Sequence, residues 1–224
     1  MAKPKHRIPP QKKTGRSPSK TVHPSIDSIK SPKADKDNSF QTALDNKNYD
    51  LAKKILAESS KNMPEWRRLN LEGLITISQG DLVATERILL RSLRHPEAGV
   101  KPYKNLVSVY SQMGRLRDAL PLAEKAHNME PESLEIALLY INCLLDLAKS
   151  DDVIRVADKL LEKNKNQRQL LLAKASALRA GFKPEESSLL VDEILKLFPN
   201  DPTAMRLKAD ILGDTDSVAA VKIY

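Results

Sequence analysis

The sequence predicts an all-α fold built from stacked helical hairpins, and three observations support this prediction. Residues 100–133 carry apolar and small side chains at helical spacings before a proline, and a weaker copy of this pattern recurs about 34 residues upstream and downstream. Leu, Ala, Lys and Glu dominate, which favours helix, whereas only seven glycines and 4% aromatic residues argue against a barrel or sandwich. The residues of the pattern are Tyr103, Leu106, Tyr110, Gly114, Ala119, Ala123, Ala126 and Pro131.

The N-terminal segment, residues 1–37, differs from the rest of the chain in composition and charge. Residues 1–36 hold ten Lys or Arg and two Asp, which gives +8, the formal net charge of the whole chain. The remaining residues therefore sum to zero. A segment of Pro, Lys and Ser buries too little apolar surface to offset its chain entropy, so we expect a disordered basic tail. Ser17 and Ser31 each precede a proline and are candidates for phosphorylation.

Helical repeats follow the tail. In the unit 100–133, the apolar spacing predicts one helix over about residues 101–113 and a second over about residues 116–129. Gly114 supplies the turn between them, and Pro131 stops the second helix. We divide the repeat domain, residues 38–224, into a degenerate unit 38–65, the units 66–99, 100–133, 134–167 and 168–201, and an incomplete unit 202–224.

The other units vary the same plan. Gly80 and Gly181 predict the turn in units 66–99 and 168–201, whereas Ser150, Asp151 and Asp152 stand at the turn of unit 134–167. We expect these acids, like Glu185 and Glu186, to cap the helices that follow them. A lone hairpin buries too little apolar surface to fold, so neighbouring units must share one continuous core.

The last unit ends about nine residues into its expected second helix, at Tyr224, and that stub is apolar. Solenoids usually carry a polar capping helix after their last repeat. Two interpretations remain open at this point: the stub is a short plug, or the chain is part of a longer protein.

The unit 100–133 resembles a tetratricopeptide repeat (TPR), because its Tyr103, Gly114, Ala119 and Pro131 occupy signature places of that family. Fewer signature residues remain in the other units, and the resemblance covers about residues 38–224. It implies a right-handed superhelix in which the first helix of each unit lines a concave groove. In this family the groove binds peptides or partner helices.

The resemblance also implies which side chains line the groove. The charged members of this set have an alternative interpretation as ordinary solvated residues, and the leucines are either an exposed apolar strip or covered by tight curvature. Carboxylate capture, a binding mode of some family members, is not expected, because only Asn105 fits it and Glu135 would repel the ligand. The expected lining residues are Arg67, Asn70, Leu74 and Ile77, then Lys101, Lys104, Ser108 and Ser111, then Glu135, Leu138, Asn142 and Leu145.

The sequence predicts no catalytic residue, metal ligand or cofactor. His95 and His127 fall near the ends of second helices, where the helix dipole favours a partial positive charge. The single cysteine, Cys143, lies in the apolar run Ile136–Leu147, so we expect a buried, inert thiol. No His or Cys pair has the spacing of a metal site.

We therefore predict a non-catalytic, cytoplasmic scaffold that binds a protein or peptide partner. The chain has neither the apolar core of a secretory signal nor a run of eighteen apolar residues. One alternative, by analogy with the family, is the repeat region of a larger enzyme such as a sulfotransferase or glycosyltransferase. The other is a polyanion binder that contacts nucleic acid or an acidic surface through residues 1–36, without sequence recognition because the tail lacks aromatic residues.

Overall fold

A computed structural model describes the backbone of residues 32–221 and, within that range, the side chains of residues 38–214. Residues 32–221 form α-helices and one short 3-10 helix and contain no strand, which confirms the predicted all-α fold. The elements are α1 (Pro32–Asp45), α2 (Tyr49–Ser59), η1 (Ser60–Asn62), α3 (Glu65–Ser78), α4 (Leu82–Ser92), α5 (Val100–Gln112), α6 (Leu116–Met129), α7 (Leu134–Asp146), α8 (Ser150–Leu161), α9 (Arg168–Ala180), α10 (Pro184–Leu197) and α11 (Pro202–Val221).

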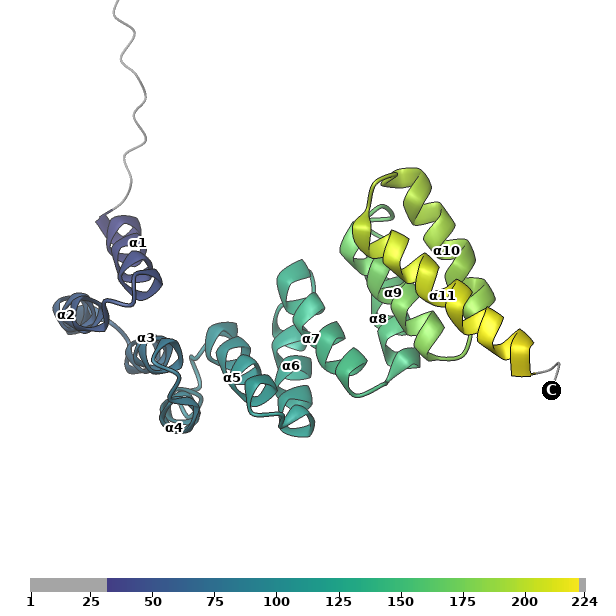
Figure 1. The fold of residues 1–224 in the computed structure, drawn as a ribbon. Coiled ribbons are helices and arrows are strands. Elements are labelled where there is room, and N and C mark those ends of the chain that lie inside the picture. The colour runs from purple at the N-terminus through teal and green to yellow at the C-terminus, as the bar shows by residue number, and fades with distance from the viewer. Residues whose placement is uncertain (1–31, 222–224) are drawn as a thin grey trace, which may run out of the picture.

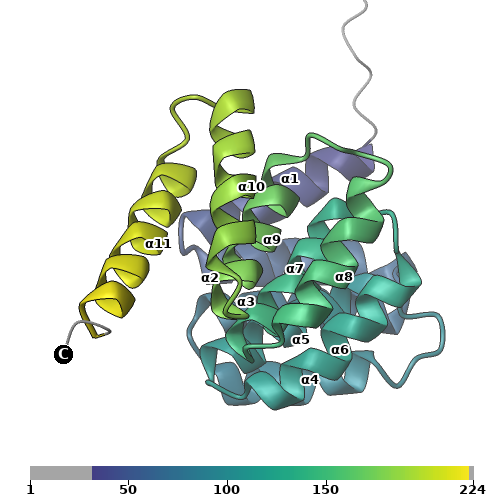
Figure 2. The ribbon, with the colours of Figure 1, turned by 90° about the vertical axis from the view of Figure 1, so that its right-hand side faces the viewer.

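Consecutive helices pack as hairpins, and the hairpins stack. The pairs α1–α2, α3–α4, α5–α6, α7–α8 and α9–α10 each make close contact, and the first helix of one hairpin also contacts the first helix of the next from α3 to α11. Figure 1 shows the hairpins following one another along an arc, with α1 and α2 at one end and α10 and α11 at the other. In the view turned by 90°, the helices α1 to α9 lie behind one another as a stack (Figure 2).

The buried core runs from one hairpin into the next. Its largest cluster joins α4 to α9 through fully buried side chains such as Leu89, Leu106, Ile141 and Val153. A second cluster joins α9, α10 and α11, and a third joins α1, α2 and α3. The predicted sharing of a core between neighbouring units is therefore observed from α4 to α9.

Helix α9 belongs to two of these clusters at once. Leu170 and Ala177 face the cluster that reaches back to α4, whereas Leu171 and Ala175 face the cluster formed with α10 and α11. A helix that is apolar on more than one side must be covered on each of them. Helix α9 is accordingly the element through which the two clusters meet.

The turn inside each hairpin has one geometry. A residue with positive φ recurs every 33 or 34 residues, and the N–H of the residue after it donates to a carbonyl five residues back, which closes the helix end in a Schellman-type turn. Gly80 and Gly114 are two of the three glycines that the sequence predicts in these turns. The five residues are Lys47, Gly80, Gly114, Ala148 and Phe182, with φ of 54°, 81°, 71°, 55° and 60°.

Two predictions about these turns are wrong in detail. Gly181 has φ of −84°, and the left-handed position in its turn is held by Phe182. The acids Asp151 and Glu185 lie inside the first turns of α8 and α10 rather than at the caps, which are Lys149 and Lys183 without a side-chain cap bond. Acids in the first helical turn still favour the helix through its dipole.

The last helix also differs from its prediction. Helix α11 continues through Gly213 to Val221, so the expected turn within unit 202–224 is absent. Arg179 of α9 contacts α11 around this glycine, because its guanidinium lies 3.6 Å from Asp210 and 2.7 Å from Asp214, one helical turn apart and on either side of Gly213. These pairs join the part of α11 around Gly213 to α9.

The N-terminal segment overlaps the first helix. Helix α1 begins at Pro32, inside the stretch that composition assigns to the tail. Ser17, Ser31 and most of the basic residues of the tail lie outside the described residues, so these predictions stay untested. Within residues 32–221, no helix is both long and apolar enough to cross a membrane.

Candidate functional site

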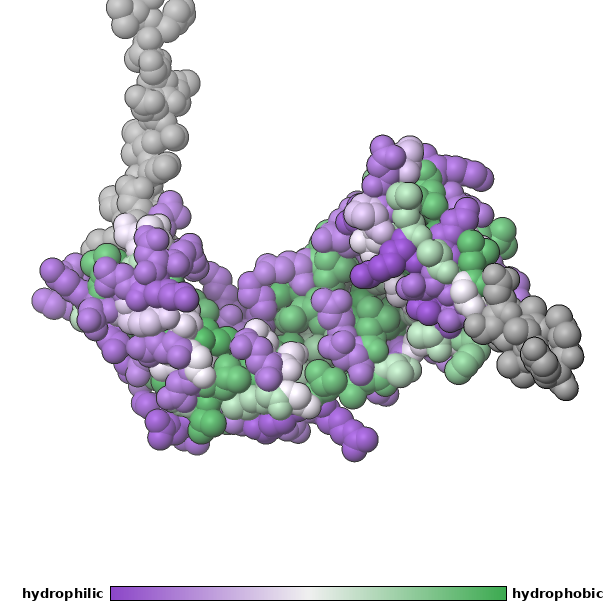
Figure 3. Space-filling model, viewed as in Figure 1, coloured by the Kyte–Doolittle hydropathy of each residue, from purple (hydrophilic) through white to green (hydrophobic). Residues whose placement is uncertain are grey.

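The sequence places the site on the first helices of three consecutive units, α3, α5 and α7. These helices belong to the middle of the arc, which is hollowed between its two ends (Figure 3). In the same view the floor of the hollow carries apolar residues among polar ones. Of the twelve expected lining residues, Ile77 packs against the core cluster of α4 to α9, and the other eleven divide into three groups according to what they touch.

The first group joins neighbouring units. Asn70 of α3 accepts a hydrogen bond from the side-chain amide of Asn105 on α5 at 2.8 Å, and only 3% of Asn70 is exposed. A buried amide needs such a partner, because leaving it unsatisfied is destabilising. Asn70 therefore lies between repeats and not on the open surface, contrary to its prediction. Asn105 is the single residue that fits the carboxylate-binding mode, and its side-chain amide is engaged in this same hydrogen bond.

The second group is charged. Lys104 of α5 lies 2.5 Å from the carboxylate of Glu135 on α7, so two predicted lining residues pair with each other across the unit boundary. The pair is partly exposed, and such pairs contribute about 0–1 kcal/mol. Lys101, one turn before Lys104, is exposed. Arg67 on α3 is half-buried.

The third group is apolar or small. Leu138 and Leu145 of α7 are half-buried and pack against the core cluster of α4 to α9, and Leu74 packs in the same way against the cluster of α1 to α3. The leucines are thus edges of the core, not a fully exposed strip. Ser108 is half-buried and accepts a hydrogen bond from the Gln112 side chain, whereas Ser111 and Asn142 are exposed.

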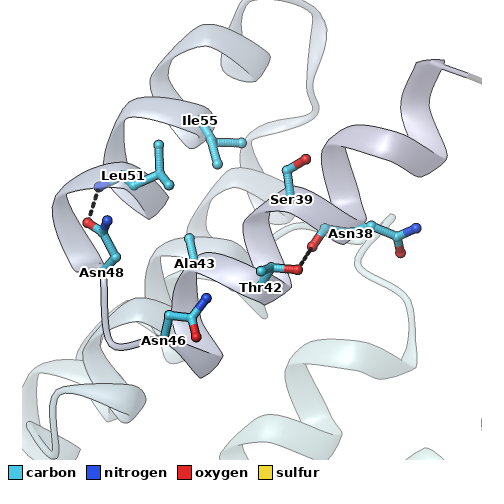
Figure 4. A pocket seen from close by; sticks show the side chains of 8 residues that line it. All are labelled: Asn38, Ser39, Thr42, Ala43, Asn46, Asn48, Leu51 and Ile55. Atoms are coloured by element: carbon cyan, nitrogen blue, oxygen red, sulfur yellow. Dashed lines mark hydrogen bonds between the residues drawn. The ribbon is translucent and has the colours of Figure 1, made fainter.

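The molecule also has local clefts, and three of them contain none of the predicted lining residues. One of about 630 Å³ lies between α1 and α2 (Figure 4). Two of its polar groups serve the helices themselves, since Thr42 donates to the Asn38 carbonyl at 2.9 Å and Asn48 caps α2 at the Leu51 amide. It is lined by Asn38, Ser39, Thr42, Ala43, Asn46, Asn48, Leu51 and Ile55, none of them charged.

A second cleft, of about 560 Å³, lies between α6, α7 and α8. The rings of His127 and Tyr140 stack on one another there, with centroids 5.5 Å apart and planes at 23°. Burial, helped by the charge of Lys159, lowers the pKa of His127 below its usual value, and burial raises the pKa of Tyr140. The interpretation of His127 as a charge favoured at a helix end is therefore wrong, because its surroundings favour the neutral ring. A third cleft, of about 500 Å³, lies between α2 and α3.

The thiol of Cys143 is buried, as predicted. Only 2% of the residue is exposed, and burial raises the pKa of the thiol to about 11. A thiol with such a pKa stays protonated at neutral pH, and the thiolate is the reactive form. Cys143 is therefore a packing residue of α7.

Comparison with known proteins agrees with this geometry. Residues 110–177 match the family model described as Tetratricopeptide repeat, and no curated protein sequence matches the chain. The fold is similar to YrrB, described as a TPR protein with an unusual peptide-binding site, at a TM-score of 0.60 and 15% identity over 78% of this chain and 86% of that one.

Two further structures give the same result. A tetratricopeptide repeat protein from Parabacteroides merdae aligns at a TM-score of 0.68 and 19% identity over 83% of this chain and 75% of that one. MamA from Desulfovibrio magneticus RS-1 aligns at a TM-score of 0.60 and 12% identity, over 69% of this chain and 87% of that one. The family match and the shared fold confirm the resemblance to tetratricopeptide repeats and the predicted solenoid. At these identities the structural likeness concerns the fold alone.

Proposed function

We propose that this chain is a non-catalytic scaffold that binds a protein or peptide partner across α3, α5 and α7. One observation supports the proposal most: half-buried leucines lie on the same helices as exposed polar side chains. On α7, Leu138 and Leu145 are half-buried while Asn142 is exposed, and Lys101 is exposed on the neighbouring α5. An apolar edge bordered by hydrogen-bonding groups is the usual composition of a peptide site.

Each type of side chain has a separate part in this proposal. The exposed edges of Leu138 and Leu145 would lose contact with water when an apolar partner residue packs on them. The amide of Asn142 both donates and accepts, so it can pair with a peptide backbone, and Lys101 favours an acidic group nearby. We propose a cytoplasmic setting, in keeping with a single buried cysteine and no disulfide partner.

The experiment is a selection of binding peptides from a random library on the full chain, followed by titration against variants. We expect the triple variant Lys101→Glu, Asn142→Ala, Leu145→Ala to weaken the selected peptides at least about tenfold, or about 1.4 kcal/mol. The matched control is Arg117→Glu with Glu124→Ala, two exposed residues of α6. Peptides that bind the triple variant and the wild type equally would refute the assignment to these helices.

A further inference from the structure

The fourth hairpin, α9–α10, departs from the other hairpins at two exposed positions. Phe182 occupies the left-handed turn position with φ of 60°, and 94% of it is exposed. The equivalent residues of the other hairpins are Lys47, Gly80, Gly114 and Ala148. An aromatic side chain is disfavoured in this backbone conformation, and here it gains no burial in return.

Leu189, seven residues after Phe182, is the second departure. It is 68% exposed on α10, whereas the four residues seven positions after the other turns are exposed and are not large apolar side chains. They are Lys54, Arg87, Pro121 and Arg155. Because the same fold is built with Gly, Ala or Lys at the first position and with Lys, Arg or Pro at the second, neither Phe182 nor Leu189 is required for folding.

Carboxylates lie on the same face of α10. Glu185, Glu186 and Glu193 stand three or four residues from Leu189, which places them beside it on a helix. All three are exposed, and none forms an ion pair with a described basic side chain. Asp192, by contrast, is 2.7 Å from Lys208 of α11. Lys183 and Lys196 lie at the two ends of the helix.

Charge also separates α10 from the other second helices. Helix α10 carries four acids and one lysine, while α4 carries one acid and two arginines, and α6 carries two acids and two bases. Glu193 stands where α4, α6 and α8 have Arg91, Lys125 and Lys159, and where α2 has Glu58. The apolar pair and the acids that lack an ion pair among the described side chains thus lie together on α10 and the turn just before it.

We propose that Phe182 and Leu189, with Glu185, Glu186 and Glu193, form a second docking surface, the α10 patch. Its occupant is a segment of another protein that carries Lys or Arg on either side of one or two large apolar residues. The apolar residues would cover Phe182 and Leu189, and the bases would pair with carboxylates that have no ion-pair partner among the described side chains, residues 38–214. Exposed aromatic residues and complementary charge are features of binding surfaces. This surface is separate from the one proposed on α3, α5 and α7.

The test measures binding of a synthetic helical peptide to the full chain by fluorescence anisotropy. In the peptide, two leucines one turn apart are flanked by lysines. The variant Phe182→Gly with Leu189→Arg gives the fourth hairpin the residue types of its neighbours, so we expect it to fold normally. Peptide affinity should fall at least about tenfold, or about 1.4 kcal/mol. The control Val83→Arg removes a 73% exposed apolar residue from α4 and should leave the affinity unchanged.

Two matched peptides test the chemistry of the occupant. Replacing the lysines by glutamates, or the leucines by alanines, should each weaken binding at least about tenfold. The chain variant Glu185→Gln, Glu186→Gln, Glu193→Gln should weaken the lysine peptide and flatten its salt dependence.

Four results would overturn the proposal. One is equal binding of the lysine peptide to the Phe182→Gly, Leu189→Arg variant and the wild type. Another is equal binding of the glutamate and lysine peptides. A third is concentration-dependent association of the chain that the same double variant abolishes, which makes the occupant a second copy. The fourth is carbodiimide cross-linking of Glu185 to a lysine within residues 1–31 of the same chain, which makes the occupant the protein's own N-terminal segment.

Discussion

The hairpins α5–α6 and α9–α10 share one backbone plan and differ in what they present to solvent. Both close with a residue of positive φ and with the same hydrogen bond, from Arg115 to Tyr110 in one and from Lys183 to Leu178 in the other. The first uses Gly114, the second the exposed Phe182. The difference teaches that the fold fixes the backbone conformation and the buried face, and leaves the exposed positions free to serve another purpose.

The largest expected effect contrasts a buried leucine of α5 with an exposed leucine of α10. Leu106 is fully buried, so Leu106→Ala should destabilise the chain by about 2–5 kcal/mol through lost apolar burial and a residual cavity. Leu189→Ala should change stability by no more than about 0.5 kcal/mol. Urea unfolding followed by circular dichroism measures both. A similar loss in the two variants would contradict the division between buried and exposed faces.

A smaller loss is expected at the turn of the α5–α6 hairpin. Gly114 has φ of 71° and no atom within 4 Å of the position where a Cβ would lie, so Gly114→Ala meets backbone strain but no clash. A non-glycine residue in the left-handed region is disfavoured by roughly 1–2 kcal/mol. The midpoint of urea unfolding should fall by a corresponding amount. Gly99→Ala, also with open space around it and without a positive φ, is the control.

The reverse substitution in the α9–α10 hairpin should have the opposite sign. Phe182→Gly relieves the left-handed strain of an exposed aromatic residue, and the added flexibility of the unfolded chain offsets part of that gain, leaving about 0.5–1 kcal/mol of stabilisation. Thermal unfolding gives the sign directly. A lower midpoint than that of the wild type would mean that Phe182 stabilises the fold through contacts, which weakens its assignment to a docking surface.

The smallest expected effect is a pH dependence at the α6–α7 boundary. The folded-state pKa of His127 is lowered, so the unfolded chain binds more protons than the folded chain at mildly acidic pH. The contribution of His127 is therefore fully present above the unfolded pKa and is lost as the pH falls through it. His127→Gln should lose less stability than the wild type between about pH 7 and pH 5. Parallel losses in the two proteins would exclude His127 as a cause.

How far the sequence predicts the fold depends on whether a feature is local. The helices of unit 100–133 and the glycine turns at Gly80 and Gly114 follow from residues close together in the chain, and they agree with the structure. Gly213 shows the limit of this reasoning. Glycine is common at helix ends, but α11 continues through Gly213, and Arg179, far away in sequence, pairs with Asp210 and Asp214 on either side of it.

The site is harder to predict than the fold for the same reason. Asn70 is correctly placed on the first helix of its unit, yet it is buried because Asn105 of the next unit reaches its side-chain oxygen. The stacking of His127 on Tyr140 similarly joins the end of one unit to the start of the next. Spacing within a unit identifies the face of a helix, whereas burial and pairing depend on the neighbouring unit.

The double membership of α9 has a consequence for how the molecule comes apart. Among the described residues, the cluster of α4 to α9 and the cluster of α9 to α11 have only α9 and Leu161 in common. Unfolding of α11 would therefore expose one side of α9 to solvent while its other side remains buried. The C-terminal end can therefore unfold locally while the cluster of α4 to α9 stays intact, and we expect this local unfolding to stop at α9.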